Sequence, residues 1–267
     1  MVVAKKKIQS KNKKNNEDID KSTSSLINSL KLIICILLLS SLPVILYNPN
    51  YSLGPLDAFR TDFFKTEIIL SGEGYNADSL VRAIRTSNTR TVKLFIRSGF
   101  NLNELDSQGN LPLCVAAETG NYEIFNLLMK GNVNFVKSNL SNGMSPIFCA
   151  IKGNNIQIIN KLISAGISVN SKNESAGGIS PAHYAAALGR DNILTHLINM
   201  GANVNAINLD GETPLHMAVS QKNIVVLYML LNSGANVNAE NHEGETPLSI
   251  AHREHNDLYE ALLKRYM

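Results

Sequence analysis

Cysteine is scarce in this sequence, which has three cysteines among 267 residues: Cys35, Cys114 and Cys149. Cys114 and Cys149 lie in short apolar stretches, where a free cysteine usually behaves as a small buried hydrophobic residue. We therefore interpret both as core residues rather than as parts of a disulfide framework or a metal site.

Motifs for catalysis are also missing. The sequence contains no Gly-x-x-x-x-Gly-Lys-Ser/Thr phosphate loop, no Gly-x-Gly-x-x-Gly and no Gly-x-Ser-x-Gly. His252, Glu254 and His255 form a cluster, and histidines three residues apart can share a helix face, but the spacing is not the His-Glu-x-x-His of a metalloprotease. We interpret this cluster as solvated surface. The sequence predicts no catalytic, cofactor-binding or metal-binding residue, and hence no enzyme.

Positive charge is confined to the start of the chain. Residues 1–31 hold eight lysines and three acids, a charge of +5, so that residues 32–267 carry −2 of the formal total of +3. Nucleic-acid binding needs clustered Lys and Arg on the face that meets the phosphates. The charge distribution thus argues against a nucleic-acid partner for residues 32–267.

What the chain does contain is a repeat. A Gly-x-x-Pro signal recurs with steps of 34, 35, 33 and 33 residues, and a fixed period in this range is typical of stacked repeat architectures. Each proline is followed by a short, small-residue helix and then by a longer apolar helix, in which Leu227, Leu230 and Leu231 exemplify a buried stripe. The five signals are Gly109/Pro112, Gly143/Pro146, Gly178/Pro181, Gly211/Pro214 and Gly244/Pro247.

The repeat unit resembles the ankyrin repeat. The family signature Thr-Pro-Leu-His-x-Ala is intact at residues 213–218, and the exit motif Gly-Ala-x-Val-Asn-Ala occurs at 201–206 and 234–239. The resemblance implies an all-α repeat solenoid of stacked helix-turn-helix pairs joined by β-hairpin-like loops. It covers residues 77–267, with repeats at about 77–108, 109–142, 143–177, 178–210, 211–243 and 244–267.

His183 and His216 occupy the same position in two repeats. A catalytic histidine is expected once, beside a partner, and not in phase with a scaffold. In the ankyrin family the histidine at this position forms hydrogen bonds among neighbouring turns. The resemblance therefore assigns a structural role to both residues.

Three segments precede the repeats. Residues 1–25 form a Lys-rich tail that we expect to be disordered, and residues 48–76 form a linker with a possible capping helix around 57–70. Between them, residues 26–47 form an apolar segment of about 33 Å as a helix, long enough to cross a hydrocarbon core of about 30 Å. We predict a single-pass transmembrane helix that follows a disordered basic tail.

The orientation of that segment follows from the flanking charge. The positive-inside rule places the Lys-rich N-terminus in the cytoplasm and the repeats on the other side of the membrane. Two alternatives are a signal peptide that is cleaved, which would release a secreted protein, and a buried helix of a soluble domain.

The resemblance also implies a partner-binding surface, because ankyrin repeats bind proteins through the concave face formed by hairpin tips and inner-helix ends. We expect one unidentified protein partner and a monomeric repeat domain. The alternatives are an exported effector that acts on a host protein and an enzyme regulator. The candidate surface residues are Gln108, Asn110, Glu118, Met144, Lys152, Ile179, Leu188, Leu209, Asp210, Glu212, Gln221, Glu243, Glu245 and Arg253.

Overall fold

The computed structural model describes residues 54–131, 133 and 145–267. The predicted tail and the predicted membrane segment at 26–47 lie outside these ranges and stay predictions. The chain divides into two compact units, Met1–Gly72 and Glu73–Met267. The first unit contains helix α2, Gly54–Leu70, where the sequence predicts a capping helix. Within the described ranges, no helix combines the length and the apolar character that crossing a membrane requires.

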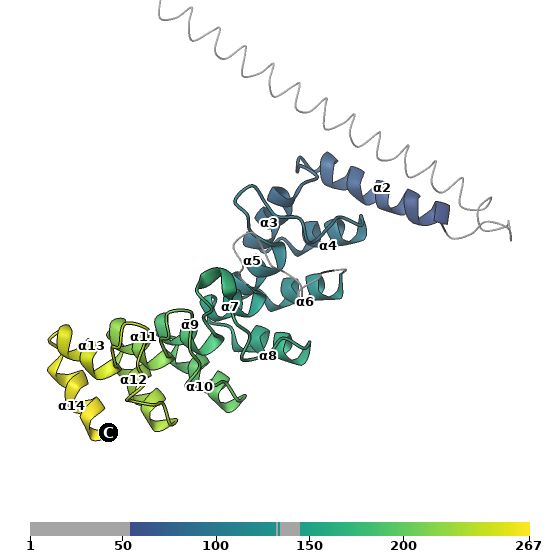
Figure 1. Cartoon of the computed structure of the whole chain (residues 1–267). Coiled ribbons are helices and arrows are strands. Elements are labelled where there is room, and N and C mark those ends of the chain that lie inside the picture. The colour runs from purple at the N-terminus through teal and green to yellow at the C-terminus, as the bar shows by residue number, and fades with distance from the viewer. Residues whose placement is uncertain (1–53, 132, 134–144) are drawn as a thin grey trace, which may run out of the picture. The chain divides into compact units, whose positions relative to one another are not determined.

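The second unit is a stack of helix pairs (Figure 1). The first helix of each pair packs against the first helix of the next pair, which gives an inner layer. The second helices form an outer layer, in which α4 contacts α6, α6 contacts α8, and α10 contacts α12. This stacking confirms the predicted all-α repeat fold. The inner helices are α3 (Ala77–Arg85), α5 (Pro112–Thr119), α7 (Pro146–Lys152), α9 (Pro181–Ala187), α11 (Pro214–Ser220) and α13 (Pro247–Arg253). The outer helices are α4 (Thr89–Arg97), α6 (Tyr122–Lys130), α8 (Ile156–Ser164), α10 (Asp191–Asn199), α12 (Ile224–Asn232) and α14 (Asp257–Arg265).

Local sequence explains where these helices begin. Five inner helices begin at a proline, whose missing N–H is not needed in the first turn of a helix. Five outer helices follow an asparagine whose side-chain oxygen accepts a backbone N–H of the first turn. The capping residues are Asn88, Asn121, Asn155, Asn223 and Asn256.

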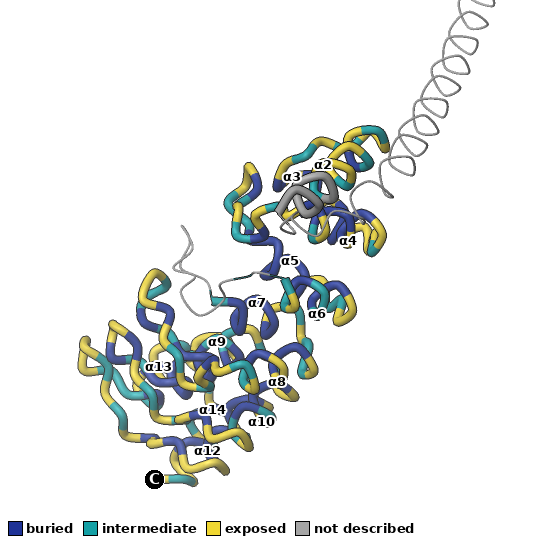
Figure 2. Tube along the Cα trace, turned by 90° about the vertical axis from the view of Figure 1, so that its right-hand side faces the viewer, coloured by how far each residue is buried: buried dark blue, intermediate teal, exposed yellow. Residues whose placement is uncertain are grey.

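The core lies between the two layers (Figure 2). On the inner side it is built from alanines such as Ala117, Ala150 and Ala186, which are fully buried and let the helices approach closely. On the outer side, the predicted stripe of α12 is buried at Leu227, Leu230 and Leu231. Because each repeat buries its apolar face only against its neighbours, the stack has one continuous core.

One expectation about the core is wrong. Cys114 and Cys149 are buried, as predicted, but their sulfur atoms form a disulfide. The Cα atoms of the two cysteines are 5.3 Å apart, within the usual range for a disulfide of about 4.4–6.8 Å. The cysteines are 35 residues apart in sequence, and stacking of α5 on α7 brings them together. The sequence indicates the burial of each residue but not their contact.

Candidate protein-binding surface

Three of the described loops between repeats are tight hairpins, each held by one polar side chain. In these loops, the side-chain oxygen of Asp106, Asn208 or Asn241 accepts hydrogen bonds from the N–H groups two and four residues later, at 2.7–3.0 Å. The loops resemble hairpins without forming a sheet, because the described part of the chain contains no β-strand and has one isolated bridge, between Asn173 and Ile179. These side chains fix the position of the hairpin tips.

The hairpin that leads into α9 is different. It is two residues longer than the others and contains a short 3-10 helix, Glu174–Ala176. Asn173 still begins the turn, and its backbone N–H donates to the carbonyl of Ile179 at 2.9 Å. Its side chain is buried, yet neither its oxygen nor its nitrogen has a hydrogen-bond partner within the described residues. In this turn the N–H groups of Ala176 and Gly178 donate to the backbone carbonyl of Asn173 and not to its side chain.

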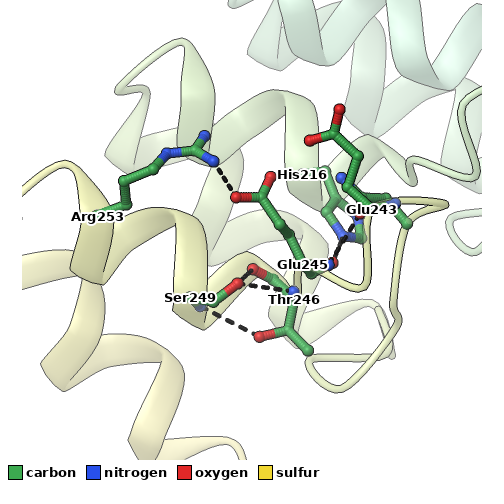
Figure 3. Close-up of polar contacts among 7 residues, drawn as sticks. His216, Glu243, Glu245, Thr246, Ser249 and Arg253 are labelled. Carbon is green, nitrogen blue, oxygen red and sulfur yellow. Dashed lines mark hydrogen bonds and ion pairs between the residues drawn. The ribbon is translucent and has the colours of Figure 1, made fainter.

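Adjacent repeats are joined by histidines, as the family resemblance implies. The Nε2 atom of His183 lies 2.9 Å from the carbonyl oxygen of Glu212, and that of His216 lies 3.1 Å from the carbonyl oxygen of Glu245 (Figure 3). On the other side of each ring, Nδ1 accepts the backbone N–H of the helix-capping residue, Ser180 or Thr213. A backbone N–H can only donate, so Nδ1 is unprotonated and Nε2–H donates to the carbonyl.

The first part of the candidate surface is polar. Gln108 is exposed and Asn110 is half-buried at the first of these hairpins. Further along, the Lys152 ammonium lies 2.8 Å from the Glu118 carboxylate, which joins α7 to α5. This hydrogen bond to Glu118 raises the pKa of Lys152.

Two residues that the sequence analysis missed extend this polar part to α9. The guanidinium of Arg190 donates to the carbonyl of Lys152 at 3.2 Å, and the Tyr184 ring packs edge-on against Phe148. Burial raises the pKa of the Tyr184 hydroxyl. Tyr184 stands at the unspecified position of the family signature and Arg190 lies outside it, so only the stacking of the helices reveals their contacts.

The middle of the candidate surface is apolar. Leu188, at the end of α9, is 39% exposed, and Leu209, at a hairpin tip, is 57% exposed. The Leu209 side chain lies directly over Gly178, where a side chain on the glycine would come within 3.0 Å of it. Ile179, the next residue, is half-buried. Leu209 and Ile179 thus lie at the longer hairpin, Leu188 lies at the far end of the helix that this hairpin leads into, and Met144 lies outside the described residues.

The last part is acidic, and two of its carboxylates have partners. Glu212 accepts a hydrogen bond from the Asn208 amide at 2.9 Å, and Glu245 forms an ion pair with Arg253 (Figure 3). The Asp210 carbonyl accepts the N–H of His242 in the next hairpin at 2.9 Å. The other predicted residues here, Gln221 and Glu243, are exposed.

The histidine cluster near the C-terminus is not arranged as a shared helix face. The Nδ1 atom of His252 lies 2.9 Å from a carboxylate oxygen of Glu260. His255 lies beyond the end of α13, in the turn before α14, with a φ of 55°. Nowhere in residues 54–131 and 145–267 do three His, Cys, Asp or Glu side chains gather as a metal site would require.

Taken together, the fold and this surface define a helical repeat protein with an extended, solvent-facing inner side. The family model for ankyrin repeats in three copies matches residues 65–139, 131–208 and 182–267. These matches cover more than half of the chain, which belongs to the ankyrin-repeat family. Ankyrin repeats indicate a role in protein–protein interaction.

The chain is also similar to parts of several larger proteins. It is 29% identical to the nuclear factor NF-kappa-B p105 subunit of Gallus gallus over 168 residues. The aligned residues make up 62% of this chain and 16% of that protein. It is 31% identical over 123 residues to the ANK repeat-containing protein nipk-1 of Caenorhabditis elegans, 42% of this chain and 20% of that protein. Alpha-latrotoxin-Lg1a of Latrodectus geometricus is 30% identical over 162 residues, 60% of this chain and 11% of the toxin. The similarity thus spans a fifth or less of each of these relatives.

Proposed function

We propose that this chain is a non-catalytic ankyrin-repeat protein, anchored in a membrane, that binds another protein through the inner side of its repeats. The observation that carries the proposal is the exposure of two leucines on the inner side: Leu188 at the end of α9, and Leu209, whose side chain lies over Gly178 next to Ile179. Polar and charged residues surround this apolar centre on both sides. An apolar centre with a polar rim is the usual composition of a protein interface.

The apolar centre should contribute more binding free energy than the acidic end of the surface. Full burial of an exposed leucine side chain contributes about 1.5–3 kcal/mol, and covering the 39% of Leu188 and the 57% of Leu209 that are exposed contributes a corresponding share. By contrast, Glu245 is already paired with Arg253, and exposed ion pairs contribute about 0–1 kcal/mol. We therefore expect Leu188 and Leu209 to contribute most to binding and the acidic residues to orient the partner.

The support for a membrane anchor is the sequence alone. Residues 26–47 form an apolar segment of sufficient length, and the preceding tail is rich in lysine. The proposed topology is single-pass, with the N-terminus in the cytoplasm. The anchor would hold the repeats, and with them the binding surface, close to one membrane.

Binding is tested by cross-linking in cells that express the tagged full-length chain. Partners should be recovered with the native sequence and lost with the double variant Leu188→Lys/Leu209→Lys. The matched control is Val225→Lys/Tyr228→Lys on outer helix α12, where both native side chains are 51% exposed. Loss of the same partners with the control, and their retention with the first variant, would place the interface on the outer side and contradict the proposal.

Anchoring is tested separately by the size and carbonate resistance of the protein carrying a C-terminal tag. Full-length protein in the washed membrane pellet supports the anchor. A shorter, soluble chain that starts near residue 41 would contradict it and support the alternative of an exported effector.

A further inference from the structure

The second repeat carries a cysteine where later repeats carry a joining histidine. Cys114 stands two residues after the proline that begins α5. His183 and His216 stand two residues after the prolines that begin α9 and α11. The three side chains therefore start from equivalent places on the inner layer.

Each of the three side chains connects its own repeat to the following one. His183 and His216 do so through hydrogen bonds to carbonyl groups 29 residues further along the chain. Cys114 does so through a covalent bond to Cys149, 35 residues further along. At the step from α5 to α7, a disulfide thus takes the place of the histidine hydrogen bond.

The surroundings of this disulfide are those of a structural cross-link. Cys114 is 7% exposed and Cys149 is 4% exposed, so soluble thiols have little access to the sulfur atoms. The neighbouring residues Ala116, Ala117 and Ala150 are fully buried, and their small size lets α5 and α7 pack closely. The bond therefore joins two helices that are already in contact.

We propose that the Cys114–Cys149 disulfide is a permanent link between the second and third repeats, and that the repeats consequently work in an oxidising compartment. Glutathione and thioredoxin keep cytosolic thiols reduced, whereas secreted and periplasmic proteins retain disulfides. The bond forms by exchange with the disulfide of a thiol–disulfide oxidoreductase, through a mixed disulfide. The S–S bond of the oxidoreductase breaks as the Cys114–Cys149 bond forms, and the oxidoreductase leaves as a dithiol that has taken up the two electrons and the two protons.

The charge of the N-terminal tail also places the repeats outside the cytoplasm. The Lys-rich N-terminal tail is expected to stay in the cytoplasm, which places the repeats on the opposite side. This part of the inference rests on the proposed anchor, and the disulfide does not depend on it. The two observations are independent, because one comes from charge near the apolar segment and the other from contacts within the repeats.

The test counts free thiols in the full chain expressed in cells. After acid quenching and denaturation, a maleimide-linked polyethylene glycol adds one tag per free thiol, and Cys35 serves as an internal reference. We expect one tag on the full-length chain before reduction and three after it. The variant Cys149→Ser should carry two tags in both conditions, because Cys114 then has no bonding partner.

Failure of the anchor and failure of the link give different results. A shorter chain without Cys35 and with no tag before reduction would retain the disulfide and contradict only the anchor. Three tags on the full-length chain before reduction, or two on a shorter chain, would overturn the disulfide and the oxidising compartment.

A stability measurement tests the linking role itself. For the full chain in detergent, a phosphine reductant should lower the thermal unfolding midpoint of the native sequence. The same reductant should leave the midpoint of the Cys114→Ser/Cys149→Ser variant unchanged. Because the sulfur atoms are buried, the tag count first confirms that the reductant has broken the bond. An equal midpoint for the native sequence with the bond intact and with the bond broken would then overturn the role of the disulfide as a link.

Discussion

The Nε2 atom of His216 lies 3.1 Å from the backbone carbonyl oxygen of Glu245, one repeat further along the chain. His216 is fully buried, and its Nδ1 accepts the N–H of Thr213 in its own repeat. One imidazole thus joins a helix cap to the next hairpin, and His183 forms the equivalent contacts one repeat earlier.

Removal of this imidazole should destabilise the repeats. We expect His216→Ala to lower the free energy of unfolding by about 1–3 kcal/mol, because it leaves a buried N–H without a partner and opens a cavity. Urea denaturation followed by circular dichroism measures the loss. His242→Ala, which removes an exposed imidazole, is the control and should stay within about 0.5 kcal/mol of the native value. Equal stability of the two variants would contradict the joining role.

The same histidines should make stability depend on pH. Burial lowers the pKa of His183 and of His216 below the ordinary value of 6.5. Between the folded and unfolded pKa values the unfolded chain binds more protons, so stability rises with pH. Their contribution is complete above about pH 7 and is lost as the pH falls below 6.5 towards the folded pKa values.

Urea midpoints measured between pH 8 and pH 5.5 check this dependence. The double variant His183→Ala/His216→Ala should show a flatter profile than the native chain in this range. The carboxyl groups with shifted pKa values, those of Asp78 and Glu260, do not interfere, because their pKa values lie below 3.8 and 4.5. Parallel profiles for the native chain and the variant would assign the pH dependence to other groups.

The turn inside each repeat offers a stabilising substitution. His255 adopts a left-handed backbone with a φ of 55°, and the equivalent turns of two other repeats use Gly120 and Gly189. We expect His255→Gly to raise the free energy of unfolding by about 1 kcal/mol, because a left-handed backbone costs a residue with a Cβ atom about 1–2 kcal/mol. The reverse change, Gly189→Ala, should be destabilising. A loss of stability in His255→Gly would show that the imidazole makes contacts that offset this backbone cost.

Two loop glycines, Gly211 in a hairpin and Gly234 just after helix α12, should respond differently to the same change. Gly211 and Gly234 both have positive φ values, of 77° and 82°. A Cβ atom on Gly234 meets open space, whereas one on Gly211 would lie 2.9 Å from the backbone nitrogen of His242. Gly234→Ala should cost about 1–2 kcal/mol for the backbone conformation alone, and Gly211→Ala should cost more. Thermal unfolding of both variants compares them directly, and equal losses would contradict the close packing of Gly211 against the next hairpin.

Most of the repeat fold could be predicted from local sequence. The proline after each glycine starts an inner helix, and apolar spacing such as Leu227, Leu230 and Leu231 identifies the buried face of an outer helix. These signals act within a few residues, so they can be recognised without the tertiary structure. The structural role of His183 and His216 followed from their recurrence in the same phase.

Contacts between repeats could not be predicted in the same way. The disulfide forms because the stacking of α5 on α7 brings the Cα atoms of Cys114 and Cys149 to 5.3 Å from each other. The position of Arg190 beside Lys152 likewise depends on stacking, since the two residues are 38 positions apart in sequence. The spacing of the repeats shows that neighbours stack, but it does not say which side chains meet.

The sequence by itself determined the family, the phase of the repeats and the residues that start and end the helices, because these depend on backbone preferences within a few residues. The tertiary structure decided which residues join one repeat to the next: a disulfide at Cys114 and imidazoles at His183 and His216. It also decided that the side chain of Leu209 lies over Gly178 in the preceding hairpin. The physical reason is that burial and bonding between repeats depend on the packing of neighbouring helices, which local sequence patterns do not specify.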